Sequence, residues 1–195
     1  MRTGGIRGAE VSDHGGFGFK AVADLRIEAC YFTGSVVALQ LGAVDDARVM
    51  NCTFDANVEI GILLNGGNFD LARTPTNWRI LGCTFRNNNQ DNNYHEIHPA
   101  VLFAEVGGSH YGVIAGCQFY DDQDPKTQRY AISFSGAATS DFITLADNRL
   151  SADLSAGASP FYGSPQEFDW TRILGCFLEH DEFGPGRGHA LSLQE

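Results

Sequence analysis

The stretch Ile80-Leu81-Gly82-Cys83-Thr84-Phe85 is one copy of a hexapeptide that recurs along the chain. Related copies occupy residues 27–32, 49–54, 114–119, 145–150 and 173–178. All five cysteines stand at the fourth position of a copy, and Asn148 stands there in the fifth copy. The cysteine position therefore gives a register for aligning the rest of the sequence. Asn148 must either find hydrogen-bond partners in the interior or mark a coil with different packing.

Three short strand-like segments accompany each copy. Successive cysteine positions are 22, 31, 34, 31 and 28 residues apart, a repeat size typical of a solenoid whose coils bury apolar side chains against each other. The second segment ends in an apolar residue three before the cysteine. The third places the cysteine and the phenylalanine on one face, which is predicted to be the interior. The first segment alternates at the strand period, at residues 37–41, 60–64, 101–103, 132–134 and 191–193.

The repeat has the pattern apolar residue, any residue, Asn or Gly, Cys, any residue, Phe. Over about residues 17–193 it resembles the repeat of the pectate-lyase superfamily. That superfamily includes polysaccharide lyases, polygalacturonases, epimerases and phage tailspikes. The resemblance implies an all-β fold, a right-handed parallel β-helix of about six coils in a single domain over residues 1–195. Rungs about 4.8 Å apart would stack the cysteines into an internal column of reduced thiols. Residues 1–16 are predicted to be an irregular N-terminal segment, with either open coils at both ends or loops folded over them.

The composition limits the classes of partner. The sequence has 24 acidic and 13 basic residues, a net charge of −11, so nucleic acid is not expected as a partner. The cysteine spacing does not fit a zinc site, and no cofactor is expected, although oxygen-rich Asp121, Asp122 and Asp124 could hold calcium. No apolar run is long enough to span a membrane, and no signal peptide is visible. We expect an extracellular protein or one on a virion surface.

Long segments follow the third strand in four consecutive coils, and stacking should bring them to one acidic edge. The candidate catalytic residues there are Asp121, Asp122, His95 and Glu96, because glycoside hydrolysis needs two carboxyl groups and a lyase needs a base. Asp121-Asp122 resembles the Asp-Asp pair of polygalacturonases, without its companion motifs. The sequence around His95 and Glu96 resembles part of the alginate epimerase motif, without its Asp-Pro. The alternative is a solvated acidic rim that performs no chemistry.

Two outward-facing columns are predicted on the second strand. Four residues before the cysteine position stand Arg26, Arg48, Arg79, Val113, Thr144 and Arg172, and six before it stand Asp24, Asp46, Asn77, Tyr111, Phe142 and Trp170. The aspartates are expected to separate the charges of the stacked arginines. The candidate substrate-binding or interface residues are Tyr111, Phe142, Trp170, Arg79 and Arg172. The aromatic column has three interpretations: a platform for sugar rings, an interface between subunits, or side chains covered by neighbouring loops.

The outer face of the first strand offers Gln40, Leu63, Leu102 and Ser133. This column has neither a carboxylate nor a base, which disfavours a polygalacturonase-type site there. The sequence therefore predicts a polysaccharide-recognising β-helix of tailspike or secreted type, with cleavage as a lyase or glycoside hydrolase left open. The alternative is a structural or assembly module without enzymatic activity, such as a virion spike or fibre subunit. In either case a homo-oligomer, such as a trimer, or a larger assembly is expected.

Overall fold

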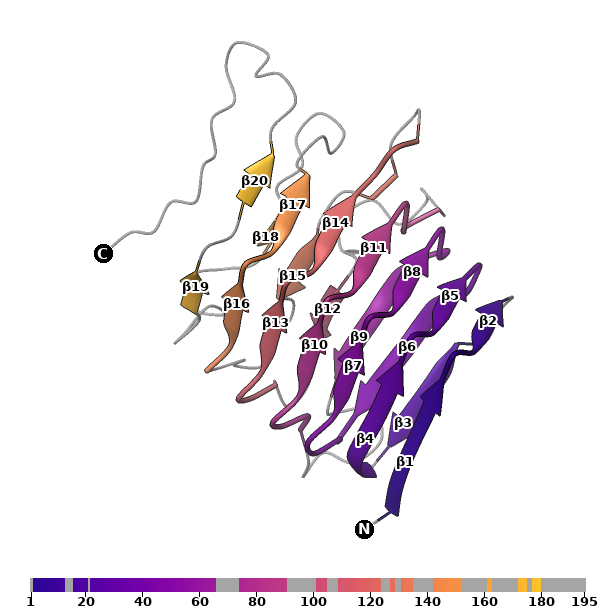
Figure 1. Cartoon of the computed structure of the whole chain (residues 1–195), viewed down its shortest axis with the longest axis vertical. Helices are drawn as coiled ribbons and strands as arrows, with labels where there is room; N and C mark the ends of the chain where they lie inside the picture. Colours follow the sequence, from indigo (N-terminus) through magenta and orange to yellow (C-terminus); the bar gives the residue numbers. More distant parts are fainter. Residues whose placement is uncertain are drawn as a thin grey trace.

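The computed structural model describes residues 2–12, 16–20, 22–65, 74–90, 101–104, 109–123, 127–128, 131–134, 142–151, 161–162, 172–174 and 177–179. Within these residues every regular element is a β-strand, and the strands form three parallel sheets of seven, seven and six members. Successive strands go to successive sheets, so the chain winds as a parallel β-helix (Figure 1), as predicted. No helix in these ranges could cross a membrane.

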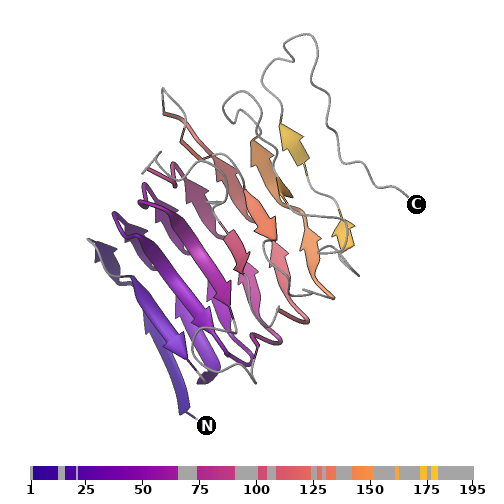
Figure 2. The same ribbon diagram turned by 180° about the vertical axis from the view of Figure 1, so that it is seen from behind.

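The three sheets are built as follows. Sheet A contains β1 (Arg2–Arg7), β4 (Val22–Glu28), β7 (Arg48–Met50), β10 (Arg79–Leu81), β13 (Val113–Ala115), β16 (Thr144–Ala146) and β19 (Arg172–Leu174). Sheet B contains β2 (Glu10–Ser12), β5 (Tyr31–Thr33), β8 (Thr53–Asp55), β11 (Thr84–Arg86), β14 (Gln118–Tyr120), β17 (Arg149–Ser151) and β20 (Phe177–Glu179). Sheet C contains β3 (Phe17–Lys20), β6 (Val37–Gly42), β9 (Ile60–Asn65), β12 (Val101–Ala104), β15 (Ile132–Phe134) and β18 (Phe161–Tyr162). Sheets A and B lie toward the viewer in Figure 1, and sheet C is seen from behind in Figure 2.

The prediction of an irregular segment over residues 1–16 is wrong for its described part. Strand β1 pairs in parallel with β4, and β2 pairs in parallel with β5. The pairing uses backbone groups and needs few side chains. A Cβ atom at Gly5 would lie 2.5 Å from the backbone oxygen of Arg26, so glycine allows the close approach of β1 to its neighbour.

The hexapeptide register is confirmed by the strand pairing. The apolar residue before the turn, exemplified by Ile80, pairs with its counterpart in each neighbouring coil. The phenylalanines stack as an internal ladder of parallel rings, with centroids 4.7 to 4.8 Å apart. These are Phe32, Phe54, Phe85 and Phe119, all essentially inaccessible to solvent. Stacking of equivalent residues therefore builds the core, as the repeat implies.

The cysteine column is buried, and its four described members are free thiols. Each thiol donates to the carbonyl oxygen two residues earlier, at 3.3 to 3.5 Å. Asn148 continues this column with stronger hydrogen bonds. Its Oδ1 accepts from the backbone N–H of Cys117 at 3.0 Å, and its Nδ2 donates to the carbonyl oxygen of Ile114 at 2.9 Å. The interior partners that the sequence required for Asn148 are therefore present.

One inward column adjusts residue size from coil to coil. Trp78, fully buried five residues before Cys83, lies between Ala47 in the preceding coil and Gly112 in the following one. A Cβ atom at Gly112 would lie 1.8 Å from Cζ2 of Trp78. The indole Nε1 donates to Oγ of Ser109 at 2.6 Å, so its buried polar group is satisfied. The small neighbours make room for the one large side chain.

Candidate ligand-binding surface on the outer face of sheet A

The described part of the acidic loop edge is organised by buried amides. Nδ2 of Asn57 donates to Oδ1 of Asn88 at 2.8 Å, and Nδ2 of Asn88 donates to Oε1 of Gln128 at 2.9 Å. The same amides also donate to the carbonyl oxygens of Phe32 and Phe54. This ladder joins three successive coils and satisfies backbone groups where the chain leaves sheet B. Its role is structural.

Asp121 anchors the loop that follows β14. Its Oδ2 accepts from the backbone N–H groups of Thr127 and Gln128 at 2.6 and 2.7 Å, and its Oδ1 accepts from that of Gln123 at 3.0 Å. With 5 % of its surface exposed, the carboxylate is directed into its own loop. These contacts assign Asp121 a role in folding the loop, and a catalytic role for it stays a prediction.

Asp122 is exposed and forms a reciprocal pair with Asn87. Nδ2 of Asn87 donates to Oδ1 of Asp122 at 2.6 Å, and the backbone N–H of Asp122 donates to Oδ1 of Asn87 at 2.9 Å. His95, Glu96 and Asp124 lie outside the described residues, so their predicted proximity to Asp122 stays a prediction. Among the residues that are described, no three His, Cys, Asp or Glu side chains are grouped as a metal site would require.

The outer face of sheet C has the column that was predicted. Gln40, Leu63, Leu102 and Ser133 occupy equivalent positions in successive strands. Nε2 of Gln40 donates to Oδ1 of Asn65 at 3.0 Å, which links two coils on this face. This column contains neither an acid nor a base, which disfavours a polygalacturonase-type site among these four residues.

The arginine column on sheet A is confirmed, because Arg26, Arg48 and Arg79 are register partners. Arg26 pairs with Asp24 of its own coil at 2.6 Å. Asp46 lies between the other two guanidinium groups, 3.3 Å from each. The aspartates therefore separate the like charges as expected. All five side chains are between a third and a half exposed, so each ion pair contributes at most about 1 kcal/mol to stability.

The residues six before the cysteine position share an unusual backbone conformation that the sequence analysis missed. Their φ angles are 50° to 54°, in the left-handed region, at Asp24, Asp46, Asn77, Tyr111 and Phe142. Asp and Asn tolerate this region, because their short polar side chains form local hydrogen bonds. An aromatic residue has no such compensation, and the conformation costs roughly 1 to 2 kcal/mol. The Asp and Asn residues at this position in the first three coils were the sequence signal for the left-handed conformation.

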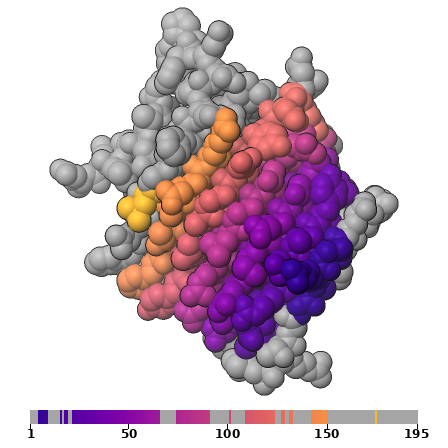
Figure 3. All heavy atoms as spheres, viewed as in Figure 1, coloured from indigo at the N-terminus to yellow at the C-terminus, as the bar shows by residue number. Residues whose placement is uncertain are grey.

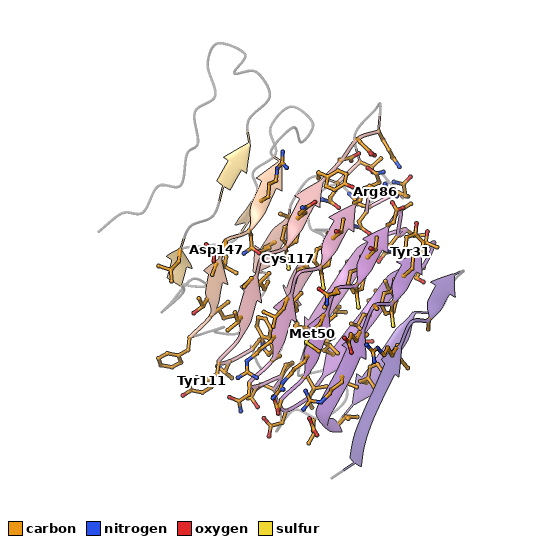
Figure 4. The ribbon with its side chains drawn as sticks, in the orientation of Figure 1. Tyr31, Met50, Arg86, Tyr111, Cys117 and Asp147 are labelled. Atoms are coloured by element: carbon orange, nitrogen blue, oxygen red, sulfur yellow. The ribbon has the colours of Figure 1, made fainter. Side chains whose placement is uncertain are left out.

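Tyr111 and Phe142 form an exposed aromatic pair at this corner. Their ring centroids are 4.9 Å apart and the rings are within 4° of parallel, which matches the spacing of the coils. Tyr111 is 57 % exposed and Phe142 is 44 % exposed. The loops that were expected to cover them lie mostly outside the described residues, so that interpretation stays a prediction. Figure 4 shows Tyr111 at the edge of sheet A, directed away from the ribbon.

Asn77 precedes Tyr111 in the same column, since its backbone N–H donates to the carbonyl oxygen of His110 at 3.2 Å. Its side chain is too short to cover a phenol ring, and its Nδ2 donates to Oδ1 of Asp45 at 3.0 Å. One face of the Tyr111 ring stacks on Phe142, and more than half of the residue's surface remains exposed. Trp170 lies outside the described residues, and of Arg172 only the backbone, in β19, is described.

The outer face of sheet A changes character along the helix axis. In the arginine column, Val113 and Thr144 follow Arg79 in register, and Arg172 follows Thr144. In a neighbouring column, Ala115, Ala146 and Leu174 are register partners, and Leu174 is 47 % exposed. The aromatic pair therefore stands where the series of ion-paired arginines ends.

These observations define the class of the protein as a parallel β-helix with an exposed aromatic corner. No protein-family model matches the sequence, and a search of curated proteins finds no match. Among solved structures, the chain is similar to the A-module of mannuronan C-5 epimerase AlgE6 from Azotobacter vinelandii, with a TM-score of 0.55 and 11 % identity. The similarity covers 83 % of this chain and 39 % of that one, so this chain spans about two fifths of that module's length. At this identity the likeness establishes the fold alone.

Proposed function

We propose that the chain is a polysaccharide-binding β-helix that holds its glycan through the aromatic pair, Tyr111 and Phe142. One observation carries the proposal: two aromatic residues occupy left-handed backbone positions and remain exposed. Stability does not account for them, because the backbone conformation is unfavourable and little apolar surface is buried in return. Strain without a packing gain is typical of residues retained for binding.

The surroundings of Tyr111 suit a sugar ring. The C–H face of a pyranose can pack against the exposed part of the phenol ring, as apolar faces do on aromatic side chains. Arg79, the register partner of Val113, is partly exposed in the preceding coil, and its guanidinium keeps N–H groups beyond those that face Asp46. Asn77, also in the preceding coil, is exposed. An aromatic surface with adjacent hydrogen-bond donors is therefore available to a hydroxyl-rich ligand.

These contacts support binding of a glycan at Tyr111 and Phe142 without cleavage. The nearby carboxylates already have partners, since Asp46 pairs with two arginines and Asp45 accepts from Thr76 and Asn77. The similar solved structure is a module of a mannuronan C-5 epimerase, and mannuronan is a polysaccharide. Membership of the pectate-lyase superfamily, and a location outside the cell or on a virion, belong to the same proposal.

The test uses variants that keep the left-handed backbone at positions 111 and 142 but lose the aromatic rings. Asparagine at positions 111 and 142 suits the left-handed backbone, as it does at Asn77, so Tyr111→Asn with Phe142→Asn should leave the free energy of unfolding unchanged or raise it by about 1 kcal/mol. A glycan that covers half of one ring buries roughly 100 Å² of apolar surface, or up to about 2.5 kcal/mol. Binding should therefore weaken by up to roughly seventyfold.

Binding is measured first on a glycan array and then by calorimetry with the glycan that binds. Tyr111→Phe is the matched control, because it keeps the ring and should keep most of the affinity. Glycan binding that survives the double asparagine substitution would refute the site. A folded wild-type protein that binds no glycan on a broad array would refute the function.

An assembly module is the second candidate, and the exposed Leu174 favours it. Together with Ala115 and Ala146 it extends the aromatic pair into an apolar area that another subunit could bury. On this alternative, the wild-type protein forms a defined oligomer in sedimentation experiments, and the double asparagine variant is monomeric. A monomeric wild-type protein at high concentration would exclude it.

A further inference from the structure

A second polar cluster lies on the outer face of sheet B, away from the aromatic pair. The hydroxyl of Tyr31 donates to Oδ2 of Asp55 at 2.6 Å, and Nε of Arg86 donates to Oδ1 of Asp55 at 3.0 Å. A terminal nitrogen of Arg86 completes the ion pair at Oδ2. The three residues come from consecutive strands, β5, β8 and β11, and Figure 4 labels Tyr31 and Arg86 on this side of the ribbon.

Asp55 acts here as a positioning residue. Only 7 % of its surface is exposed, and both of its oxygens are occupied by the two neighbouring side chains. Burial raises the pKa of Asp55, but the hydrogen bonds from Arg86 and Tyr31 outweigh burial, so that its pKa is lowered. The hydrogen bond to Asp55 raises the pKa of Tyr31. At neutral pH the cluster therefore holds a phenol, a carboxylate and a guanidinium, with no net charge.

The cluster leaves hydrogen-bonding groups available in fixed positions. A phenol that donates its proton retains acceptor lone pairs, and a guanidinium has five N–H groups, more than Asp55 can accept. Replacing a buried ion pair by apolar residues is often neutral or stabilising, so stability alone does not account for burying Asp55 on an outer face. Its contacts instead fix Tyr31 and Arg86 with a defined orientation toward the solvent.

These residues belong to a longer strip along the helix axis. One column of sheet B carries Tyr31, Thr53, Thr84 and Gln118 in register, and the adjacent column carries Asp55, Arg86 and Tyr120. Arg86 also interacts with Tyr120 of the next coil. The two tyrosines are three rungs apart, or about 14 Å, comparable with a short oligosaccharide. Together these seven residues are the polar strip.

We infer that the polar strip is a second glycan-contact surface, which takes neutral, hydroxyl-rich glycans. Fixed donors and acceptors between two tyrosine rings match a chain of sugar hydroxyls and C–H faces. The seven residues of the strip have no net charge, and Arg149 follows Gln118 in the next coil. The protein's net charge of −11 repels polyanions, so a neutral glycan is the complementary ligand. The inference rests on the proposed function for its class of ligand but uses a different sheet. Sheets A and B lie on the side of the molecule that Figure 3 shows, where successive coils form adjacent diagonal bands of colour.

The experiment uses the full chain with cellohexaose, maltohexaose and mannohexaose as probes, followed by NMR chemical shifts and titration. At least one probe should shift resonances of Tyr31, Thr84 and Gln118. Thr84→Arg places a long side chain in the middle of the strip and should weaken this binding by at least about tenfold, or 1.4 kcal/mol. Val36→Arg, at an exposed turn position outside the strip, is the control and should bind as the wild type does.

Tyr31→Phe gives a second measurement, because it removes the hydroxyl and keeps the ring; it should weaken binding several-fold while the protein remains folded. The double asparagine variant at Tyr111 and Phe142 separates the two sites and should retain the shifts in the strip. Glycans that shift only sheet A resonances, or that bind the Thr84→Arg and wild-type proteins equally, would overturn the inference and leave the proposed function standing. If no neutral or acidic glycan binds anywhere, both are refuted.

Discussion

Replacing Asn148 by alanine should lower the free energy of unfolding by about 2 to 4 kcal/mol. The side chain is 1 % exposed, and it satisfies the backbone N–H of Cys117 at 3.0 Å and the carbonyl oxygen of Ile114 at 2.9 Å. Alanine removes both partners, and a buried polar group left without one costs about 1 to 3 kcal/mol. Two such groups, partly relieved by local relaxation, give the expected range.

Asn148→Cys is the matched control, because the neighbouring coils show what a cysteine does at this position. The backbone N–H of Cys83 donates to Sγ of Cys117 at 3.4 Å, and that thiol is 3.6 Å from the carbonyl oxygen of Ile80. A thiol at position 148 should make the same longer, weaker bonds and lose roughly half as much stability as alanine. Urea unfolding followed by circular dichroism measures both variants at constant m-value. An alanine variant as stable as the wild type, or more stable than the cysteine variant, would refute the reasoning.

Three further predictions concern the core and the polar strip. Phe85 stacks on two phenylalanines and Phe32 on one, so Phe85→Leu should lower the free energy of unfolding in urea by about 0.5 to 1.5 kcal/mol more than Phe32→Leu does. Gly112→Ala should lower the free energy of unfolding by about 3 kcal/mol, because the added methyl group clashes with Trp78. Adding Trp78→Leu should restore most of the lost melting temperature. A double variant that melts no higher than Gly112→Ala would contradict this explanation. Because the pKa of Asp55 is lower in the folded state, its stabilisation is complete above the unfolded pKa of about 3.9 and disappears as the pH falls through the folded pKa. As the pH is lowered from about 6 to about 2, the free energy of unfolding should therefore fall less steeply in Asp55→Asn than in the wild type.

The hexapeptide predicted the pairing in sheets A and B because its apolar positions must face the interior in every coil. Residues that repeat at Ile80 and Phe85 can stack only on their equivalents, which fixes the register. Strands β1 and β2 were not predicted, since their glycine-rich sequence lacks the cysteine and the phenylalanine. Their pairing depends on backbone hydrogen bonds, which leave little trace in the side-chain pattern.

The candidate surfaces were predictable in part. Alignment on the cysteine placed Tyr111, Phe142 and the arginines in their columns, but it did not reveal the left-handed backbone that directs the aromatic pair outward. The contacts of Asp121 also depend on how the loop returns to it, which spacing along the sequence does not specify. For the polar strip the signal was available: Tyr31 follows Cys30 directly, and Asp55 and Arg86 stand third after their cysteines.

Departures from the repeat in the interior are compensated by a neighbouring coil. Trp78 is matched by Gly112, and Asn148 satisfies the backbone of the coil before it. A solenoid permits such exchanges because each coil contacts only its neighbours. On the outer faces no packing requirement applies, so a departure that costs free energy has no structural compensation. The left-handed conformation of Tyr111 is of this kind, and this cost without a packing gain is the physical reason for placing a ligand contact there. The burial of Asp55 is different, because hydrogen bonds from Tyr31 and Arg86 compensate it. The reason for placing ligand contacts at Tyr31 and Arg86 is that these bonds hold both side chains in fixed positions at the surface.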